Sequence, residues 1–392
     1  HGAKAAIEFQ HQGHSWYTPK NCQGHKVYAP SGFIRSDGVI VETMPESEIL
    51  NMCRLAADAA YNAMNTGFDV LLIHAGHGML MNQFQSPINN KRTDSYGGSL
   101  ENRARFANTM LEMIREKVGS NMLIEYRISG TENNPNGYDI NDCIEFIKLL
   151  EDKIDLIQVS TSVNPPRPGA KALVMASSFY PEAPFIELPR AVKASGIKLP
   201  VVAVAGIHRP QLAEEIISDG TADAICTVRG LICDPEMPKK ALYGNSESIT
   251  PCIRCFYCSD HHISSRYFSC SVNPRIGRER CTPKTIPLSA NPRRVAVIGG
   301  GPAGMKAALT AAEAGHTVTL FEKSDHLGGQ LVFSKKADFK HDLCRYMNWL
   351  ISQVDKEKNI TVKLNTNANA SLMNDFSPDC IIAALGASPI TP

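Results

Sequence analysis

The sequence has no long apolar run, no excess of charge of either sign and no short repeat. No apolar run approaches the roughly 18 residues that a membrane-spanning helix needs. Lys and Arg number 40 against 39 Asp and Glu, and no basic stripe marks a surface for nucleic acid or an anionic membrane. We therefore expect neither of them as a partner. The chain opens with HGAKAAIEF, without methionine, basic start or apolar leader, so we expect a cytoplasmic fragment without a signal peptide.

The composition that is present belongs to an ordinary globular protein. Hydrophobic residues make up 43% and charged residues 20% of the 392 residues. At roughly 100–200 residues per domain, this length predicts two or three domains. Twelve cysteines in a chain of this length do not make a small disulfide scaffold, so their positions are more informative than their number.

Residues 1–243 alternate between predicted strands and helices. The strands are expected at Ala5–Phe9, Val70–Ile73, Leu123–Arg127, Leu156–Ser160, Val201–Ala205 and Ala224–Val228. The helices are expected at Ser47–Asn65, Leu100–Lys117, Asn141–Glu151, Ile186–Ala194 and Pro210–Ser218. This alternation predicts a parallel α/β sheet, either doubly wound or closed into a barrel. Eight such units close a (β/α)₈ TIM barrel, so we expect that two N-terminal units are missing and that the first and last strands each keep an unpaired edge.

Residues 244–292 lose this periodicity and carry a cysteine cluster. Cys252, Cys255 and Cys258 form C-x2-C-x2-C, and Cys270 follows after eleven residues. Three thiolates at this spacing, with a fourth from a loop, predict the ligands of a [4Fe–4S] cluster. A structural zinc site is the alternative, although zinc normally uses two separated C-x2-C pairs. His261 and His262 lie between the ligands and are interpreted as solvated loop residues, and the cysteines outside this segment as small core residues.

Residues 293–392 begin with a glycine-rich motif. G-x-G-x-x-G follows the predicted strand Val295–Ile298 at the start of a helix and consists of Gly299, Gly301 and Gly304. Glu322 ends the next strand about twenty residues later, where an acid can bind a ribose hydroxyl. Pro302-Ala303 and the downstream Gly328-Gly329-Gln330 favour FAD over nicotinamide. We therefore interpret this region as a partial Rossmann-like FAD domain, since ending at Pro392 omits about half the expected strands.

Two histidines follow the predicted strand Val70–Ile73, in the segment His74-Ala75-Gly76-His77-Gly78. Barrel enzymes keep catalytic groups at the C-terminal ends of their strands. Two histidines three residues apart can converge on one oxygen atom as paired hydrogen-bond donors. A metal pair and two solvent-exposed side chains are the alternatives, and no carboxylate at metal-ligand spacing supports the metal.

Arg127, Gly206, Arg229 and Gly230 also stand at predicted strand ends. Phosphate sites in barrels commonly use the loops after strands seven and eight, where Gly206 and Arg229-Gly230 fall. Together these residues suggest a phosphate-bearing cofactor.

A longer motif resembles a known family. Asn82-Gln83-Phe84, Ser86-Pro87 and RTDSYGGSLENRARF, which starts at Arg92, resemble the signature of old yellow enzyme-type barrels. The order of barrel, cysteine segment and dinucleotide domain resembles the multidomain branch that contains 2,4-dienoyl-CoA reductase, enoate reductase, bile-acid enone reductases and trimethylamine dehydrogenase. The resemblance covers essentially the whole chain. It implies FMN in the barrel, a [4Fe–4S] cluster and FAD, with electrons passing from NAD(P)H through FAD and the cluster to FMN, and then as hydride to a conjugated C=C bond.

The resemblance also implies roles for individual residues. His74 and His77 match the pair that holds the substrate carbonyl, and Arg127 matches the arginine beside the flavin N1/C2=O edge. The FMN phosphate loops are matched by Gly206, Arg229 and Gly230, and the cluster ligands by Cys252, Cys255, Cys258 and Cys270. Arg103 and Arg105, within the signature, are interpreted as structural ion-pair formers.

The sequence departs from the family pattern at several positions. Glu8 stands where many relatives have a flavin-binding Gln, and Met79 stands where the usual proton-donating Tyr lies. The segment STSVNPPRPG after the fourth predicted strand contains no His, although dienoyl-CoA reductases have a catalytic His nearby. A thioether cannot donate a proton, so we expect protonation by water or another loop, with Tyr17 as one candidate.

We therefore predict an NAD(P)H-dependent reductase of an activated C=C bond in a small molecule. The spacing C-x2-C-x2-C instead resembles amine dehydrogenases, which are the alternative. His74 occupies a position where such a relative carries an aromatic residue for its cationic substrate, and this disfavours the alternative. A third reading is a zinc-stabilised nucleotide-binding module without enzymatic activity. The sequence does not indicate the oligomeric state.

Overall fold

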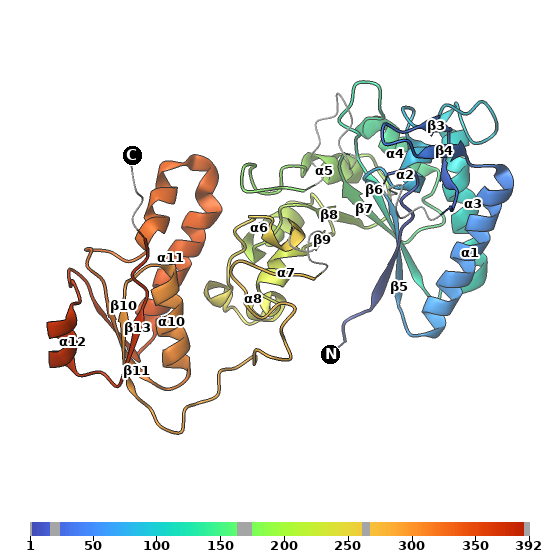
Figure 1. Cartoon of the computed structure of the whole chain (residues 1–392). Coiled ribbons are helices and arrows are strands. Elements are labelled where there is room, and N and C mark those ends of the chain that lie inside the picture. Colours follow the sequence, from blue (N-terminus) through green and yellow to red (C-terminus); the bar gives the residue numbers. More distant parts are fainter. Residues whose placement is uncertain (1, 16–23, 163–174, 261–266, 388–392) are drawn as a thin grey trace. The chain divides into compact units, whose positions relative to one another are not determined.

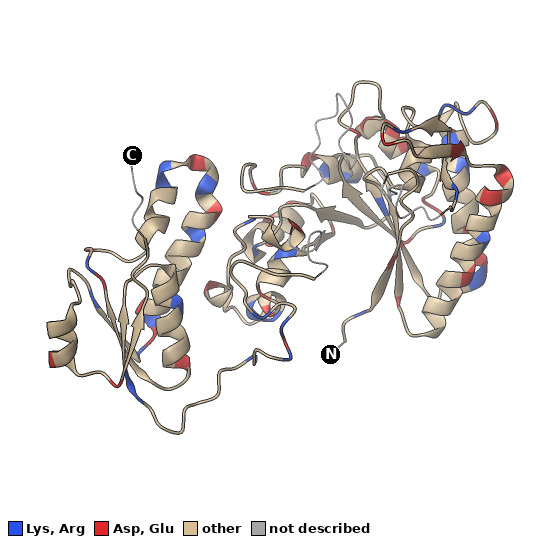
Figure 2. Cartoon of the chain, viewed as in Figure 1, with Lys and Arg blue, Asp and Glu red and all other residues tan. Residues whose placement is uncertain are grey.

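The structure is a computed structural model that describes residues 2–15, 24–162, 175–260 and 267–387 (Figure 1). The chain forms two compact units. The first consists of His1–Ala176, Glu182–Ile207 and Gln211–Cys226, and the second of Ser177–Pro181, His208–Pro210 and Thr227–Pro392. Acidic and basic residues are interspersed along the helices rather than separated by sign (Figure 2). No helix in the described ranges is both long and apolar enough to cross a membrane.

A six-stranded parallel sheet organises the first unit. Its order is β1-β5-β6-β7-β8-β9, and its strands are β1 (Ala6–Phe9), β5 (Val70–Ala75), β6 (Leu123–Ser129), β7 (Leu156–Ser160), β8 (Val201–Val204) and β9 (Ala224–Cys226). Within the described residues, β1 pairs only with β5 and β9 only with β8. The expected parallel sheet with two free edges is therefore confirmed. The last strand ends two residues earlier than predicted, because Val228 is exposed and precedes a helix.

Helices follow the strands as the alternating pattern predicts. They are α1 (Glu46–Asn65), α2 (Leu80–Gln85), α3 (Leu100–Val118), α4 (Ile140–Lys148), α5 (Glu187–Ala194) and α6 (Pro210–Ser218). In α1 the buried residues Ile49, Cys53, Ala57 and Ala60 recur at helical spacing and join the core beneath the sheet. Ser99 caps α3, and Asp139 with Asp142 forms a capping box at α4.

Several short elements have no counterpart in the sequence prediction. A three-stranded sheet of order β2-β4-β3 consists of β2 (Val27–Ala29), β3 (Phe33–Ile34) and β4 (Ile40–Thr43). Strands of two to four residues are too short to show a readable alternation.

Arg103 and Arg105 are structural, but they donate to the backbone carbonyls of Gln85 and Ser95 rather than to the carboxylates that were expected.

The second unit contains the cysteine segment and a four-stranded parallel sheet. The order is β12-β11-β10-β13, with β10 (Arg294–Ile298), β11 (Thr317–Phe321), β12 (Ile360–Lys363) and β13 (Cys380–Ala383). Its helices are α7 (Arg229–Cys233), α8 (Met237–Leu242), α10 (Pro302–Glu313), α11 (His341–Lys356) and α12 (Ala370–Phe376), and its 3₁₀ turns are η1 (Ser246–Ser248), η2 (Gly329–Lys336) and η3 (Asp338–Lys340). Val297, Met305, Leu320 and Leu350 form the centre of its core. This is the α/β arrangement that the glycine motif predicts.

Candidate active site and cysteine cavity

The two predicted catalytic histidines lie at the C-terminal end of β5. All six residues of this strand are buried, so the core fixes the position of His74. His77 has a φ of 58°, and its backbone N–H donates to Ser129 Oγ of β6 at 3.0 Å. A non-glycine residue in this left-handed conformation persists only where its surroundings hold it, and such residues cluster at functional sites.

The loop that carries His77 is held by α2. The Gly78 N–H donates to Asn82 Oδ1 at 2.7 Å, and the Gly78 carbonyl accepts from Gln83 Nε2 at 2.7 Å. Asn82 also donates to the hydroxyl of Tyr138 at 2.7 Å, and both amide side chains are fully buried. The Asn-Gln-Phe motif of the sequence therefore positions the histidine loop.

A continuous chain of polar contacts runs through the two histidines. Glu8 Oε1 lies 2.9 Å from His74 Nδ1, and His74 Nε2 lies 2.9 Å from His77 Nδ1. His77 Nε2 lies 2.6 Å from Ser160 Oγ at the end of β7. All four ring nitrogens of the pair are therefore engaged with protein groups, instead of converging freely on one point. Sequence reasoning missed Ser160, because only the pairing of β5, β6 and β7 brings it beside His77.

The charges along this chain differ from end to end. Burial lowers the pKa of His77 well below its usual value, and the neighbouring His74 and Arg127 act in the same direction. The hydrogen bond from His74 lowers the pKa of Glu8 despite its partial burial, with a further contribution from the Arg127 charge. Near neutral pH the chain therefore has an anionic end at Glu8 and a neutral imidazole at His77.

Arg127 lies on β6 beside the anionic end of the chain. Its Nη1 is 3.4 Å from Glu8, and its Nε donates to Gln158 of β7. Gln158 in turn donates to Glu125 at 2.7 Å. Beside Glu8 and His74 opens a cleft of about 370 Å³, whose other walls are mainly apolar side chains of α1 and α3. A cation and a cleft are thus present at the Glu8 end of the contacts between Glu8, His74, His77 and Ser160.

The remaining residues singled out for this site are distributed between the units. Met79 is buried at the start of α2 and has no transferable hydrogen. Gly206 belongs to the first unit, whereas Arg229 and Gly230 belong to the second. Gly206 has a φ of +76°, and a Cβ at Gly230 would meet Thr227 Oγ1 at 2.9 Å, so both positions suit glycine. Tyr17, His261 and His262 lie outside the described residues.

The four cysteines of the predicted cluster line one cavity. This cavity is lined by Cys252, Cys255, Cys258 and Cys270, together with Arg229, Arg254 and Phe256. Cys281 is exposed and is not among the lining residues. Four thiols around one space are the ligand set of an iron–sulfur cluster, and a structural zinc ion can take the same set.

A fifth cysteine contacts this group. Cys233, at the end of α7, is buried, and its Sγ lies 3.2 Å from the Thr250 carbonyl oxygen. A hydrogen bond from Cys233 lowers the pKa of Cys270 to about 6. Burial raises the pKa of Cys252 to about 11. Sequence reasoning treated Cys233 as a core residue, and only the packing of α7 against the cysteine segment reveals the contact.

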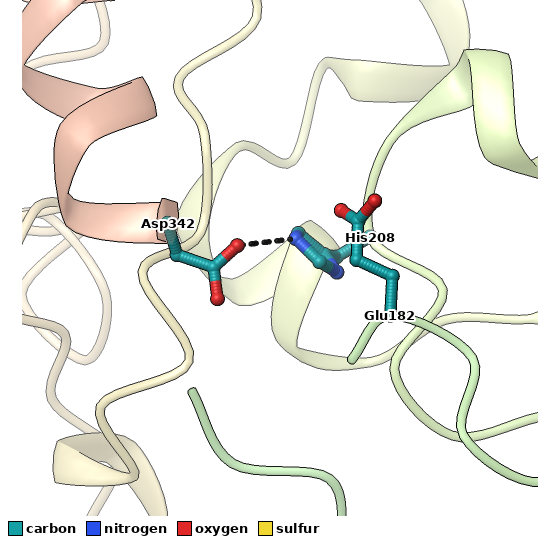
Figure 3. A group of neighbouring side chains, drawn as sticks. All are labelled: Glu182, His208 and Asp342. Carbon is teal, nitrogen blue, oxygen red and sulfur yellow. Dashed lines mark ion pairs between the residues drawn. The ribbon is translucent and has the colours of Figure 1, made fainter. Parts of the chain in front are cut away.

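Arg254 fixes the backbone between two of the cysteines. Its side chain is fully buried, its Nε lies 2.6 Å from Asp342 Oδ2 at the start of α11, and its Nη2 donates to the Tyr180 carbonyl at 2.9 Å. Asp342 also lies 3.3 Å from His208 Nε2, the contact drawn in Figure 3. The cysteine segment is therefore anchored to the helix that follows the glycine-rich region.

The glycine motif forms a tight turn between β10 and α10. Gly299 has a φ of +108°, and a Cβ at Gly304 would meet the Gly299 carbonyl oxygen at 1.8 Å. A Cβ at Gly301 would meet nothing closer than Gly329 Cα at 3.9 Å, so the two glycine loops face each other. Glu322 accepts from the Gly300 N–H at 2.6 Å, and its carboxylate is therefore turned toward the turn itself. Gln330, beside the second loop, donates to the Ala387 carbonyl.

Comparisons with known proteins agree with this architecture. Residues 1–247 match the NADH:flavin oxidoreductase / NADH oxidase family, and residues 294–373 match the FAD dependent oxidoreductases. An NADH oxidase of Thermoanaerobacter brockii is 35% identical over 400 residues, which cover 100% of this chain and 60% of that protein.

Two solved structures show the same architecture. A 2-naphthoyl-CoA reductase in complex with 2-naphthoyl-CoA is 31% identical, has a TM-score of 0.86 and covers 94% of this chain and 56% of its own. Histamine dehydrogenase from Rhizobium sp. 4-9 is 27% identical, has a TM-score of 0.91 and covers 100% of this chain and 57% of its own. The chain thus spans between 56% and 60% of the length of these relatives.

Proposed function

Since this chain belongs to the NADH:flavin oxidoreductase / NADH oxidase family, we propose that it is part of an NAD(P)H-dependent flavin and iron–sulfur enzyme that reduces an activated C=C bond of a small molecule. The observation that carries the proposal is the chain of polar contacts Glu8–His74–His77–Ser160 at the strand ends. A substrate carbonyl conjugated to the C=C bond requires such donors. The similarity to 2-naphthoyl-CoA reductase supports this substrate class.

The proposal assigns three regions to three groups. Residues 1–243 would bind FMN, 244–292 would hold a [4Fe–4S] cluster and 293–392 would bind FAD. The FMN residues would be Glu8, Arg127, Gly206, Arg229 and Gly230; the FAD residues would be Gly299, Gly301, Gly304, Glu322, Gly329 and Gln330. Cys252, Cys255, Cys258 and Cys270 would bind the cluster. When bound, these groups would carry electrons from NAD(P)H and supply the hydride.

The residues of the chain would prepare the substrate. A neutral His77 donates its single N–H from Nδ1 to His74 Nε2 and accepts the Ser160 hydroxyl at Nε2. It can turn the Nδ1–H to the substrate carbonyl and stabilise the negative charge that develops on this oxygen. Glu8 holds the Nδ1–H tautomer of His74, because an ionised carboxylate accepts this hydrogen bond. Arg127 would place a cation beside the flavin edge. Met79 contributes no proton, so the proton at Cα would come from water or from the hydroxyl and imidazole groups of this chain.

Amine oxidation is the second candidate function. The similarity to histamine dehydrogenase and the C-x2-C-x2-C spacing favour it. An amine cation would be bound by a carboxylate or by a group of aromatic rings. Among the four described residues Glu8, His74, His77 and Ser160, Glu8 is the one carboxylate. Glu8, however, is already paired with His74 and Arg127, so reduction of a C=C bond remains the first proposal.

The test is anaerobic purification of the full-length protein with analysis of flavin, iron and sulfide. Enones, enoates, enoyl-CoA thioesters and amines are then supplied under turnover conditions. We expect FMN, FAD and iron to copurify, and NAD(P)H oxidation to follow the addition of an unsaturated carbonyl compound. Turnover of amines alone would favour the second function. Zinc without flavin would contradict both.

A further inference from the structure

An arginine of the second unit has an unpaired donor at the cysteine cavity. Arg229 lines this cavity together with the four cysteines, and its Cζ lies 4.8 Å from the centroid of the Phe256 ring. Its Nη1 is buried and has no hydrogen-bond partner among the residues that the structure describes. A buried cationic donor without a partner is costly, so such a group indicates a missing acceptor.

The second arginine of the cavity cannot supply the same interaction. Arg254 is engaged by Asp342, by the carbonyls of Tyr180 and Pro181 and by His341. Its charge is therefore compensated by Asp342. The free cationic donor of this cavity in the described residues is therefore Arg229.

We propose that Arg229 is the electrostatic partner of the iron–sulfur cluster, donating from Nη1 toward the sulfur atoms of the cavity and raising the midpoint potential of the cluster. This inference rests on the cluster assigned in the proposed function. A cluster with four thiolate ligands gains negative charge when it accepts an electron. A fixed cation and hydrogen bonds to sulfur stabilise the reduced state more than the oxidised state. Arg229 thus controls how readily the cluster receives an electron, in addition to any contact with FMN phosphate.

The experiment measures the cluster potential in the full-length holoprotein by redox titration monitored by electron paramagnetic resonance. Arg229→Gln removes the charge, and Arg229→Lys keeps it. In Arg229→Gln we expect the ratio of reduced to oxidised cluster at fixed potential to fall about tenfold, equivalent to a shift of ~59 mV to lower potential. Arg229→Lys keeps most of the wild-type potential, because the charge remains in the cavity.

Iron, sulfide and flavin contents distinguish this role from others. Arg280→Gln removes an exposed charge of the same segment and leaves the potential unchanged. If Arg229→Gln retains iron and has the wild-type potential, or if it loses only FMN, the inference is wrong. If Arg229→Gln loses the cluster, the potential of the cluster in Arg229→Lys is the test. The wild-type potential in Arg229→Lys supports the role of the positive charge, and a shifted potential contradicts it. Zinc in place of iron in the wild type would overturn the cluster assignment itself.

Discussion

At the scale of single residues, the ring nitrogens of the two histidines are already hydrogen-bonded within the protein. Each ring nitrogen of His74 and His77 has a protein partner, so a substrate oxygen must compete for at least one N–H. The contact between His77 Nδ1 and His74 Nε2 is the natural one to exchange, because a neutral ring nitrogen is a weaker acceptor than the Glu8 carboxylate, which holds the N–H of His74. We therefore expect His77 to be the donor that moves.

The first prediction concerns the histidines and Met79. His74→Ala with His77→Ala removes the donors, and we expect turnover of an enone to fall by about 10²–10³-fold, as for the loss of an oxyanion donor. Met79→Phe should leave turnover within about tenfold, because the thioether transfers no proton and a positioned general acid contributes about 10²–10⁴-fold. Steady-state kinetics with confirmed flavin content checks both. An inactive Met79→Phe with intact fold and flavin would contradict the mechanism.

The second prediction concerns Glu8, whose pKa is lowered mainly by the hydrogen bond with His74. Glu8 is therefore ionised above this lowered pKa and loses its charge as the pH falls through it. Glu8→Gln retains an acceptor for His74 but removes the anion beside Arg127. We expect a higher FMN midpoint potential in this variant at neutral pH, and a difference that shrinks as the pH falls. Spectroelectrochemistry measures both, with Glu112→Gln as an exposed control. Equal potentials across the pH range would contradict the prediction.

The sequence was sufficient for the residues at the strand ends but not for their contacts. His74 and His77 follow a buried apolar run, so the end of the strand could be located. The contact with Ser160 depends on the register of β7, and the contact between Cys233 and Cys270 on the packing of a five-residue helix. Neither property leaves a periodic pattern in the sequence.

At the scale of elements, strong periodicity decided which predictions succeeded. β7 and α6 have the predicted bounds, because a buried strand and an amphipathic helix each have a distinct pattern. The small sheet of β2, β3 and β4 was missed because its strands are short. The helix predicted at Asn141–Glu151 ends at Lys148, since the last residues form a turn rather than a further helical repeat.

The third prediction tests the turn between β10 and α10. Gly304→Ala forces a Cβ against the Gly299 carbonyl oxygen, so we expect a lower unfolding temperature of the protein together with loss of FAD. Gly301→Ala is the matched control for packing, because its Cβ has no neighbour closer than 3.9 Å. It should leave stability within about 0.5 kcal/mol but weaken FAD binding, where a phosphate approaches the backbone. If both variants are equally stable, the close approach of Gly304 does not constrain the fold.

At the scale of the whole molecule, the two units differ in how far apart in the sequence their contacting segments lie. The first is organised by one sheet whose strands follow one another along the chain. The second joins the cysteine segment to the nucleotide-type sheet, and Arg254 and Asp342, 88 residues apart, make the connection. Separating the two side chains of such a pair would leave buried charges without their closest partners, so the pair disfavours arrangements in which the cysteine segment and α11 are apart.

The last prediction is that this pair makes the second unit sensitive to acid. Burial alone would raise the pKa of Asp342, but hydrogen bonds from His208 and Arg254 lower it to about 2. A lowered carboxyl pKa contributes stability above the ordinary value of 3.8, and this contribution is lost as the pH falls toward 2. Arg254→Ala removes the closest cation from a buried carboxylate that keeps His208 and Arg345 as partners, so it should cost about 1–3 kcal/mol of unfolding free energy near neutral pH.

Urea unfolding between pH 6 and pH 2 measures both effects, with Arg254→Ala, Asp342→Asn and the double variant forming a cycle. We expect the unfolding free energy of Asp342→Asn to depend less on pH than that of the wild type. The double variant should lose less unfolding free energy than the sum of the losses in the two single variants. Purely additive effects would mean that the two side chains stabilise the unit independently. The anchoring of the cysteine segment to α11 would then have to come from the apolar core instead, in which Ile253 and Val272 of this segment pack with Leu350 and Val354 of α11.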